Sequence, residues 1–128
     1  MKGFLFIMIA AFSLAACKKS AVTPGLYGKW ELRHTMGSIR GFDSTYNTGN
    51  GRILQFNSDS SYQQYNNGKL VTQGKFHIRG SNYPTANSLS IFFGESSYEN
   101  AFILKGDKLQ IGMDFDDGVE TDYQKMQN

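Results

Sequence analysis

Cysteine is almost absent from this sequence. The single copy, Cys17, excludes a disulfide within the chain. Even in an oxidising compartment, the fold would therefore have to be stabilised by packing rather than by cross-links.

The main part of the chain also lacks an excess of one charge. Three of its thirteen Lys and Arg residues (Lys2, Lys18 and Lys19) precede residue 26, whereas all eleven Asp and Glu residues follow it. Residues 26–128 are thus about neutral. The basic footprint that nucleic-acid binding requires is missing, so we expect no nucleic-acid partner.

Long apolar runs are missing except near the start. Residues 4–14 (FLFIMIAAFSL) follow Lys2 and precede two small residues, Ala15 and Ala16. This run is too short to cross a bilayer, which needs about 20 residues. A positive residue, a short apolar stretch and small residues, in this order, indicate a signal peptide over residues 1–16.

The cysteine that directly follows this segment indicates the kind of signal. Residues 14–17 (LAAC) resemble the lipobox of bacterial lipoproteins. The resemblance implies cleavage before Cys17, a diacylglycerol on its thiol and usually an acyl group on its amine. Several acyl chains anchor a protein stably to a membrane where one chain is marginal. The alternatives are an ordinary secretory signal with a chance cysteine, or an uncleaved anchor.

The residues after Cys17 bear on its location. Lys18 and Lys19 lack the aspartate that retains enterobacterial lipoproteins at the inner membrane, and they lack the acidic run that resembles a surface-export signal in Bacteroidetes. By this resemblance we expect the outer membrane, facing the periplasm, with surface exposure as the alternative. Residues 17–25 are predicted to be the lipidated cysteine and a flexible tether, and residues 26–128 one monomeric domain.

The body of the chain shows no helical apolar period, whereas short alternating runs recur. Turn residues separate most of these runs, and short connections force antiparallel neighbours. The predicted fold class is therefore all-β: a single eight-stranded antiparallel up-and-down barrel, which leaves no exposed edge. The predicted strands are Gly28–Thr35, Arg52–Asn57, Ser60–Asn66, Lys69–Arg79, Ser88–Gly94, Tyr98–Lys105, Lys108–Phe115 and Val119–Met126.

The last two hairpins predict which face of the sheet lies inside. A two-residue turn at 106–107 pairs Phe102 with Ile111. A three-residue loop at 116–118 then pairs Ile111 with Tyr123. Both registers place apolar residues on one face and polar residues on the other, as a half-buried sheet requires.

The first predicted strand begins with Gly28-Lys29-Trp30, a G-x-W that resembles the lipocalin signature. In that superfamily the tryptophan closes one end of an eight-stranded barrel, covered by a basic residue from a late strand. This sequence departs from the pattern, because no late predicted strand carries a clear basic residue for that role, and Lys125 is the one that could take it. The order of lipobox, GKWEL, long first loop, LQFNSDSSY, GKFHI and FILKGDKLQI resembles the small lipocalin-like lipoproteins common in Bacteroidetes. A plain core aromatic is the alternative for Trp30.

The segment 36–51 is the one long connection between predicted strands. In a lipocalin-like barrel it would fold over the open mouth, where Ile39, Phe42 and Tyr46 would cover a ligand or plug an empty barrel. By alternation, His34 shares the face of Trp30. Tyrosine rings suit an amphipathic ligand or a sugar, although they are also ordinary strand residues. The candidate ligand-binding residues are Trp30, His34, Phe42, Tyr46 and Tyr62.

Nothing in the sequence forms a recognisable catalytic constellation. Cys17 would be consumed by lipid, His34 and His77 fall on separate predicted strands, and no serine stands in a G-x-S-x-G elbow. The acidic run at 114–118 lacks the spacing of a calcium loop. We therefore expect a protein that is not an enzyme and that has no metal or other cofactor.

Two functions remain. The first is a lipid-anchored cell-envelope binding protein that holds a small apolar or amphipathic ligand inside the barrel. The alternative is a filled barrel that binds a protein or a glycan through its loops, as an inhibitor or an envelope assembly factor would. Interior volume separates the two. The aromatic residues predicted to point inward, which would fill much of a small barrel, are Trp30, Phe56, Phe76, Phe102, Phe115 and Tyr123.

Overall fold

The computed structural model describes residues 23–37, 41–81, 89–112 and 118–127. Among these residues, no helix is long and apolar enough to cross a membrane. The strands are β1 (Gly28–Gly37), β2 (Phe42–Thr45), β3 (Arg52–Phe56), β4 (Ser61–Asn66), β5 (Lys69–Gly80), β6 (Leu89–Phe93), β7 (Asn100–Lys105), β8 (Lys108–Gly112) and β9 (Val119–Lys125).

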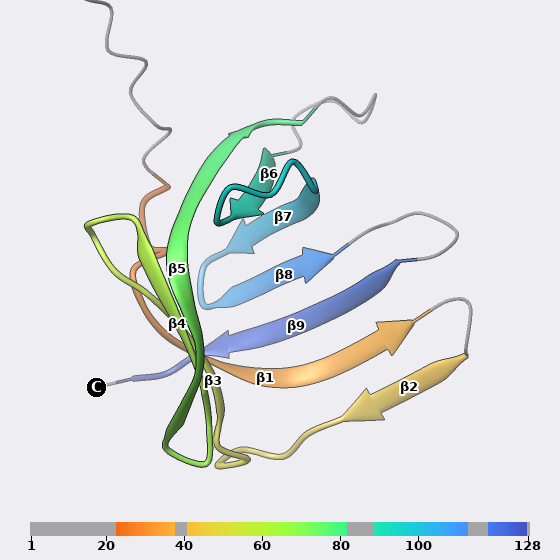
Figure 1. The fold of residues 1–128 in the computed structure, drawn as a ribbon. Coiled ribbons are helices and arrows are strands. Elements are labelled where there is room, and N and C mark those ends of the chain that lie inside the picture. Colours follow the sequence, from red (N-terminus) through yellow and green to blue (C-terminus); the bar gives the residue numbers. More distant parts are fainter. Residues whose placement is uncertain (1–22, 38–40, 82–88, 113–117, 128) are drawn as a thin grey trace, which may run out of the picture.

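Eight of these strands close into an antiparallel barrel. In sheet order β1 is followed by β3, β4, β5, β6, β7, β8 and β9, and β9 pairs with β1 again (Figure 1). The predicted fold class is therefore confirmed. Each predicted strand is present, and its ends agree within two residues wherever the structure describes them.

The ninth strand, β2, corrects the prediction that residues 36–51 form only a loop. It has four residues with one large apolar side chain, which is too short a run for alternation to reveal. β2 pairs with the far half of β1, from His34 to Gly37, whereas β3 pairs only with Gly28–Glu31. One edge of β1 thus changes partner along its length.

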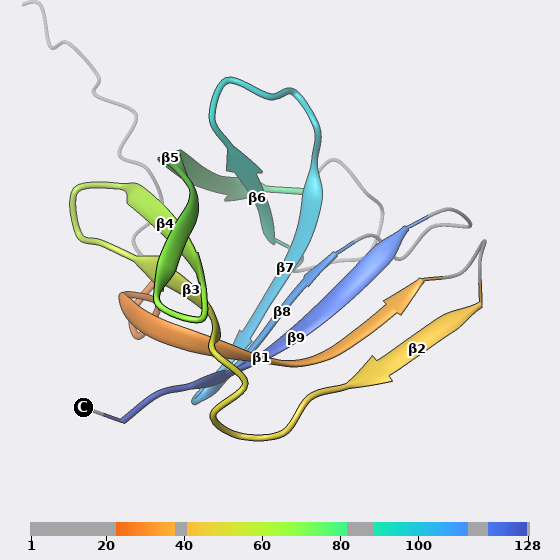
Figure 2. The same cartoon turned by 60° about the horizontal axis from the view of Figure 1, so that its bottom comes forward.

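This change of partner gives the barrel two different ends. At the closed end, where β1 starts and β9 finishes, β1 is paired on both edges with other barrel strands. At the open end, β1 no longer pairs with β3 and pairs with β2 instead. Figure 2 shows the closed end with the C-terminus on the left, and β1, β2 and β9 fanning away from β3 and β4 towards the right.

Trp30 fills the closed end. Its side chain is fully buried, and its indole N–H donates a hydrogen bond to the carbonyl of Leu26 at 2.7 Å. The ammonium of Lys125 lies 5.2 Å from the centre of the indole ring and donates to the carbonyl of Gly25. Lys125 therefore covers the tryptophan, although no clear basic residue for this role was evident in the sequence.

The interior next to Trp30 is packed with large side chains. The rings of Phe56 and Phe76 meet edge to face at 4.9 Å, and those of Tyr62 and Phe93 at 4.7 Å. Such aromatic contacts add stability to that of apolar burial. The buried cluster consists of Leu26, Trp30, Leu54, Phe56, Tyr62, Phe76, Ile78, Ile91, Phe102, Leu109 and Ile111.

The predicted register is confirmed in one hairpin and wrong in the other. Phe102 pairs with Ile111 across β7 and β8 as expected. Across β8 and β9, Ile111 pairs with Thr121, and Tyr123 pairs with Leu109. The observed register differs from the predicted one by two residues. An even shift leaves every side chain on its predicted face. Phe115 lies outside the described residues.

Replacing Trp30 with alanine should destabilise the protein by roughly 3–5 kcal/mol, because it removes a fully buried aromatic side chain. Chemical denaturation of both proteins would measure the loss. Tyr27→Ala is the control, since Tyr27 is 40% exposed and its loss should change stability by no more than about 0.5 kcal/mol. Equal losses in the two variants would contradict the closing role of Trp30.

Candidate binding sites

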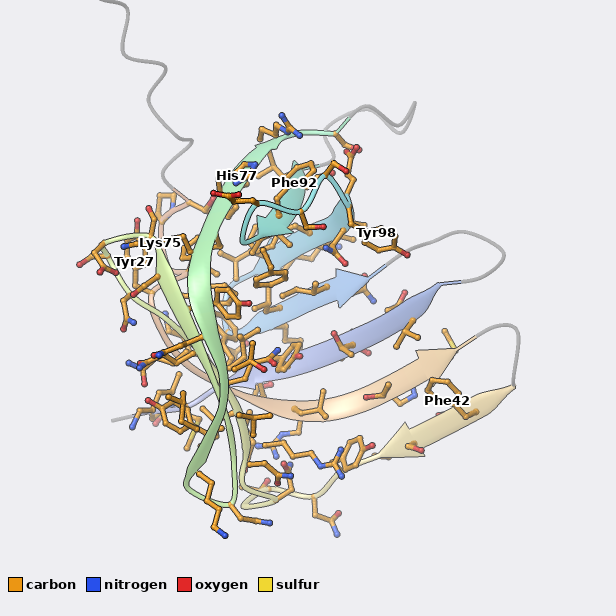
Figure 3. All side chains as sticks on the ribbon, viewed as in Figure 1. Tyr27, Phe42, Lys75, His77, Phe92 and Tyr98 are labelled. Atoms are coloured by element: carbon orange, nitrogen blue, oxygen red, sulfur yellow. The ribbon has the colours of Figure 1, made fainter. Side chains whose placement is uncertain are left out.

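The structure does not bring the five candidate ligand-binding residues together. Trp30 and Tyr62 lie in the buried core. Phe42, on β2 at the open end, places its ring over Gly37 of β1 (Figure 3). Tyr46 follows β2, where the guanidinium of Arg52 lies 4.7 Å from its ring centre.

His34 lies on the outer face of the barrel and not on the face of Trp30. β1 carries a bulge between Leu32 and His34, so that Leu32 pairs with Tyr123 but His34 pairs with Asp122. One extra residue inverts the alternation of the rest of the strand. The predicted face of His34 is therefore wrong.

A second bulge lies in β5, opposite the tyrosine-containing strand β4. Tyr62 and Tyr65 have opposite parity, and the register between β4 and β5 shifts between Gln64 and Tyr65. Tyr62 is buried, whereas Tyr65 is partly exposed. Tyr65 borders a cavity at the open end.

This inner cavity has a volume of about 210 Å³ and lies where β1 and β3 separate. Leu32 and Tyr123 line it on one side, and Leu54 and Gln64 line it on the other. Burial raises the pKa of the Tyr123 hydroxyl, which is already uncharged at neutral pH at the ordinary tyrosine pKa. Binding sites for small molecules usually measure about 300–1,000 Å³. The inner cavity is smaller than that.

A larger hollow, the outer groove, crosses the outer face of β7, β8, β9 and β1. Its volume is about 520 Å³. Most of its lining residues alternate along each strand with inward residues and therefore lie on the outer face, although Leu109 and Tyr123, which pack in or against the core, also border it. We define the outer groove by six of its lining residues, which are Arg33, His34, Ile103, Lys105, Lys108 and Asp122.

His34 is at the centre of a polar network in the outer groove. Its Nε2 lies 2.7 Å from Oδ1 of Asp43 on β2, and its Nδ1 lies 3.1 Å from Oδ2 of Asp122 on β9. The amide of Gln110 donates to the other oxygen of Asp122 at 3.1 Å. A neutral imidazole carries one N–H, so only the protonated ring donates to both carboxylates.

These contacts change the acidity of the ring. The hydrogen bond to Asp43, and then the one to Asp122, raises the pKa of His34 above the usual histidine value. A perturbed titratable group in a hollow with converging polar side chains is a common mark of a functional site. Alternation placed Asp122 and Gln110 on the outer face, but nothing in the sequence linked Asp43 to them.

Arg33, the bulged residue, also lines the outer groove. Its guanidinium lies 2.6 Å from the carboxylate of Glu31, which is nearly buried although it points outward. The backbone N–H of Gly49 donates to the same carboxylate at 2.7 Å. The segment after β2 therefore packs back over β1, and this contact holds one wall of the groove.

A separate outer-face contact involves His77 of β5. His77 is exposed, but its ring stacks on Phe92 of β6 at 4.8 Å with an angle of 5° (Figure 3). The guanidinium of Arg79 lies 4.1 Å from the centre of the same Phe92 ring. The two polar side chains shield an outward aromatic ring, which is a packing role.

No known protein family matches this sequence, and neither a curated protein nor a solved structure matches it. Within the described ranges, no group of three or more His, Cys, Asp or Glu side chains could hold a metal ion. The acidic run at 114–117 falls outside these ranges. The geometry of the cavities is thus the main guide to function.

The stabilising effect of His34 should depend on pH. Because its folded pKa is raised, the contribution is full below the unfolded value of about 6.5 and is lost as the pH rises through the folded value. The stability difference between the wild type and Asp43→Asn should therefore shrink over the range that begins near pH 6.5 and extends upward through the folded pKa of His34. Thermal unfolding across this range would measure it.

Glu95→Gln is the matched control, since Glu95 is an exposed carboxylate away from His34. Its stability difference from the wild type should not follow the same pH dependence. NMR titration of the His34 ring gives an independent measurement. A midpoint at or below about 6.5 would contradict the role of the two carboxylates.

Proposed function

We propose that the protein is a lipid-anchored binding protein of the cell envelope, of the lipocalin-like lipoprotein type, that binds an amphipathic ligand in the outer groove rather than inside the barrel. The observation that carries this proposal is the contrast between the two hollows. The outer groove has a volume of about 520 Å³, whereas the inner cavity has about 210 Å³.

The packing of the interior supports this choice. Trp30, Phe56 and Phe102 are nearly inaccessible to solvent, and the core aromatic rings contact one another. An eight-stranded barrel is just wide enough to be filled by its own side chains or to hold one small ligand. Here the side chains occupy the closed end, so an internal ligand would be limited to a small group at the open end.

The outer groove has the mixed chemistry that an amphipathic ligand needs. Ile103 contributes an apolar side chain that is 42% exposed. Arg33, Lys105 and Lys108 contribute cations, and Gln110 and Asp122 contribute hydrogen-bonding groups. Nothing in this set forms a nucleophile with an adjacent base, and the one histidine contacts carboxylates through both nitrogens. This favours binding over catalysis.

The lipid anchor in this proposal is supported by the sequence alone. LAAC at residues 14–17 places a nucleophilic thiol directly after a short apolar segment. We expect the mature protein to begin at Cys17 and to carry acyl chains there. Mass spectrometry of the N-terminal peptide from membrane-extracted protein would measure this. A mature chain without the added mass of acyl chains would contradict the lipid anchor. It would not bear on the proposal that the outer groove binds a ligand.

The site of binding can be tested by photocrosslinking in cells. A photoactivatable phenylalanine analogue at Ile103, in the outer groove, should give ligand adducts in the full-length protein. The same analogue at Val71 is the control, because Val71 is 63% exposed and borders the inner cavity. Adducts are measured as added mass on the extracted protein. Adducts at position 71 but not at 103 would place the ligand at the open end and overturn the proposal.

A further inference from the structure

Lys105 and Lys108 form a pair of like charges at one end of the outer groove. They face each other across β7 and β8, on either side of the turn at 106–107. Both are exposed and point outward, because their neighbours Leu104 and Leu109 point inward. Like charges directly opposite each other destabilise a sheet. The pair therefore costs stability unless an anion binds between them.

The protein itself does not neutralise this pair. Within the part of the chain that the structure describes, neither ammonium has an ion-pair partner. The carboxylate of Asp107, in the turn between them, accepts a hydrogen bond from Gln124 at 2.6 Å. Both oxygens of Asp122, the acidic residue that lines the groove, contact His34 and Gln110. These two carboxylates thus have other hydrogen-bond partners, and neither forms an ion pair with Lys105 or Lys108.

The lysine pair also lies beside the point where the tether joins the barrel. The carbonyl of Asp107 accepts the backbone N–H of Lys125 at 2.7 Å, and the ammonium of Lys125 donates to the carbonyl of Gly25. Gly25 ends the predicted tether. Five residues (18–22) lie between Cys17 and Thr23, the first residue described, so the two are at most about 20 Å apart. A lipid on Cys17 would therefore hold this end of the barrel close to the membrane surface.

We propose that the lysine end of the outer groove binds the phosphate of an anionic lipid headgroup in the membrane to which the protein is anchored. Two ammonium groups suit a phosphate, and each lysine near an anionic surface contributes favourably. With the phosphate between Lys105 and Lys108, the hydroxyl-bearing remainder of the headgroup points along the groove. There it meets the amide of Gln110 and the carboxylate of Asp122. This inference rests on the proposed function and names the ligand class of the same groove.

The test uses the full-length protein as processed and lipidated by its host, reconstituted in nanodiscs. One set contains phosphatidylcholine alone and the other contains phosphatidylcholine with phosphatidylglycerol. Hydrogen exchange of residues 104–110 is measured in both. We expect these amides to exchange roughly tenfold more slowly with phosphatidylglycerol, the order of magnitude for two lysines at an anionic surface. Added salt should reduce the difference.

Two variants separate this site from general attraction to the anionic surface. In Lys105→Gln/Lys108→Gln, the difference between the two kinds of nanodisc should disappear. In Lys69→Gln, it should persist, because Lys69 is exposed at the far end of β4 and β5 and does not line the groove. Equal exchange of the wild type in both nanodiscs, or equal losses in both variants, would overturn the inference.

Free glycerol phosphate, added to nanodiscs of phosphatidylcholine alone, tests a soluble source of the same group. Protection by glycerol phosphate without protection by phosphatidylglycerol would overturn the membrane as the source. A different measurement, the photocrosslinking at Ile103, would overturn the proposed function. If photocrosslinking at Ile103 gives no adduct at all, the groove is not a binding site, whereas adducts that do not depend on phosphatidylglycerol contradict only the headgroup.

Discussion

One edge of β1 cannot pair fully with two strands, and this constraint shapes the molecule. Residues Gly28–Glu31 pair with β3, and His34–Gly37 pair with β2. The opposite edge pairs with β9 along most of its length. Where β3 is the partner, the barrel is closed around Trp30. Where β2 replaces β3, the sheet opens outward, and the bulge at Arg33 marks the change. The open end, the inner cavity and one wall of the outer groove all result from this exchange of partners.

The same constraint explains why the two hollows differ in kind. The closed end needs large side chains to fill the space between eight short strands, and Trp30, Phe56 and Phe76 supply them. The remaining interior volume is small. On the outer face, the bulge turns Arg33 and His34 outward beside Asp122, and the segment after β2 covers Glu31. Polar groups that a regular strand would have separated thus meet in one groove, and binding chemistry is more plentiful outside the barrel than inside it.

The sequence predicted what depends on local pattern and failed where one residue changes the pattern. Alternation and turn residues were enough for the eight barrel strands, and the resemblance of Gly28-Lys29-Trp30 to the lipocalin signature suggested the buried Trp30, with Lys125 as a candidate to cover it. They could not reveal β2, whose four residues carry too little alternation, nor the bulge that moves His34 to the outer face. The contact between His34 and Asp43 needs both features at once. The candidate site was therefore less predictable than the fold, since it depends on two irregularities and the fold depends on regular strands.

The net charge of residues 26–128 does not reveal the local pair of positive charges at the outer groove. Residues 26–128 are about neutral in sum, which excludes a broad basic footprint. However, most of the described acidic side chains beside the groove are engaged, Asp122 by His34 and Gln110 and Asp107 by Gln124. Among the described residues that line the groove, Lys105 and Lys108 are adjacent cations without an ion-pair partner, at the end of the barrel where Lys125 contacts Gly25. A protein without a net charge can still present a local cationic site, and here that site lies at the end of the barrel that a lipid on Cys17 would bring to the membrane.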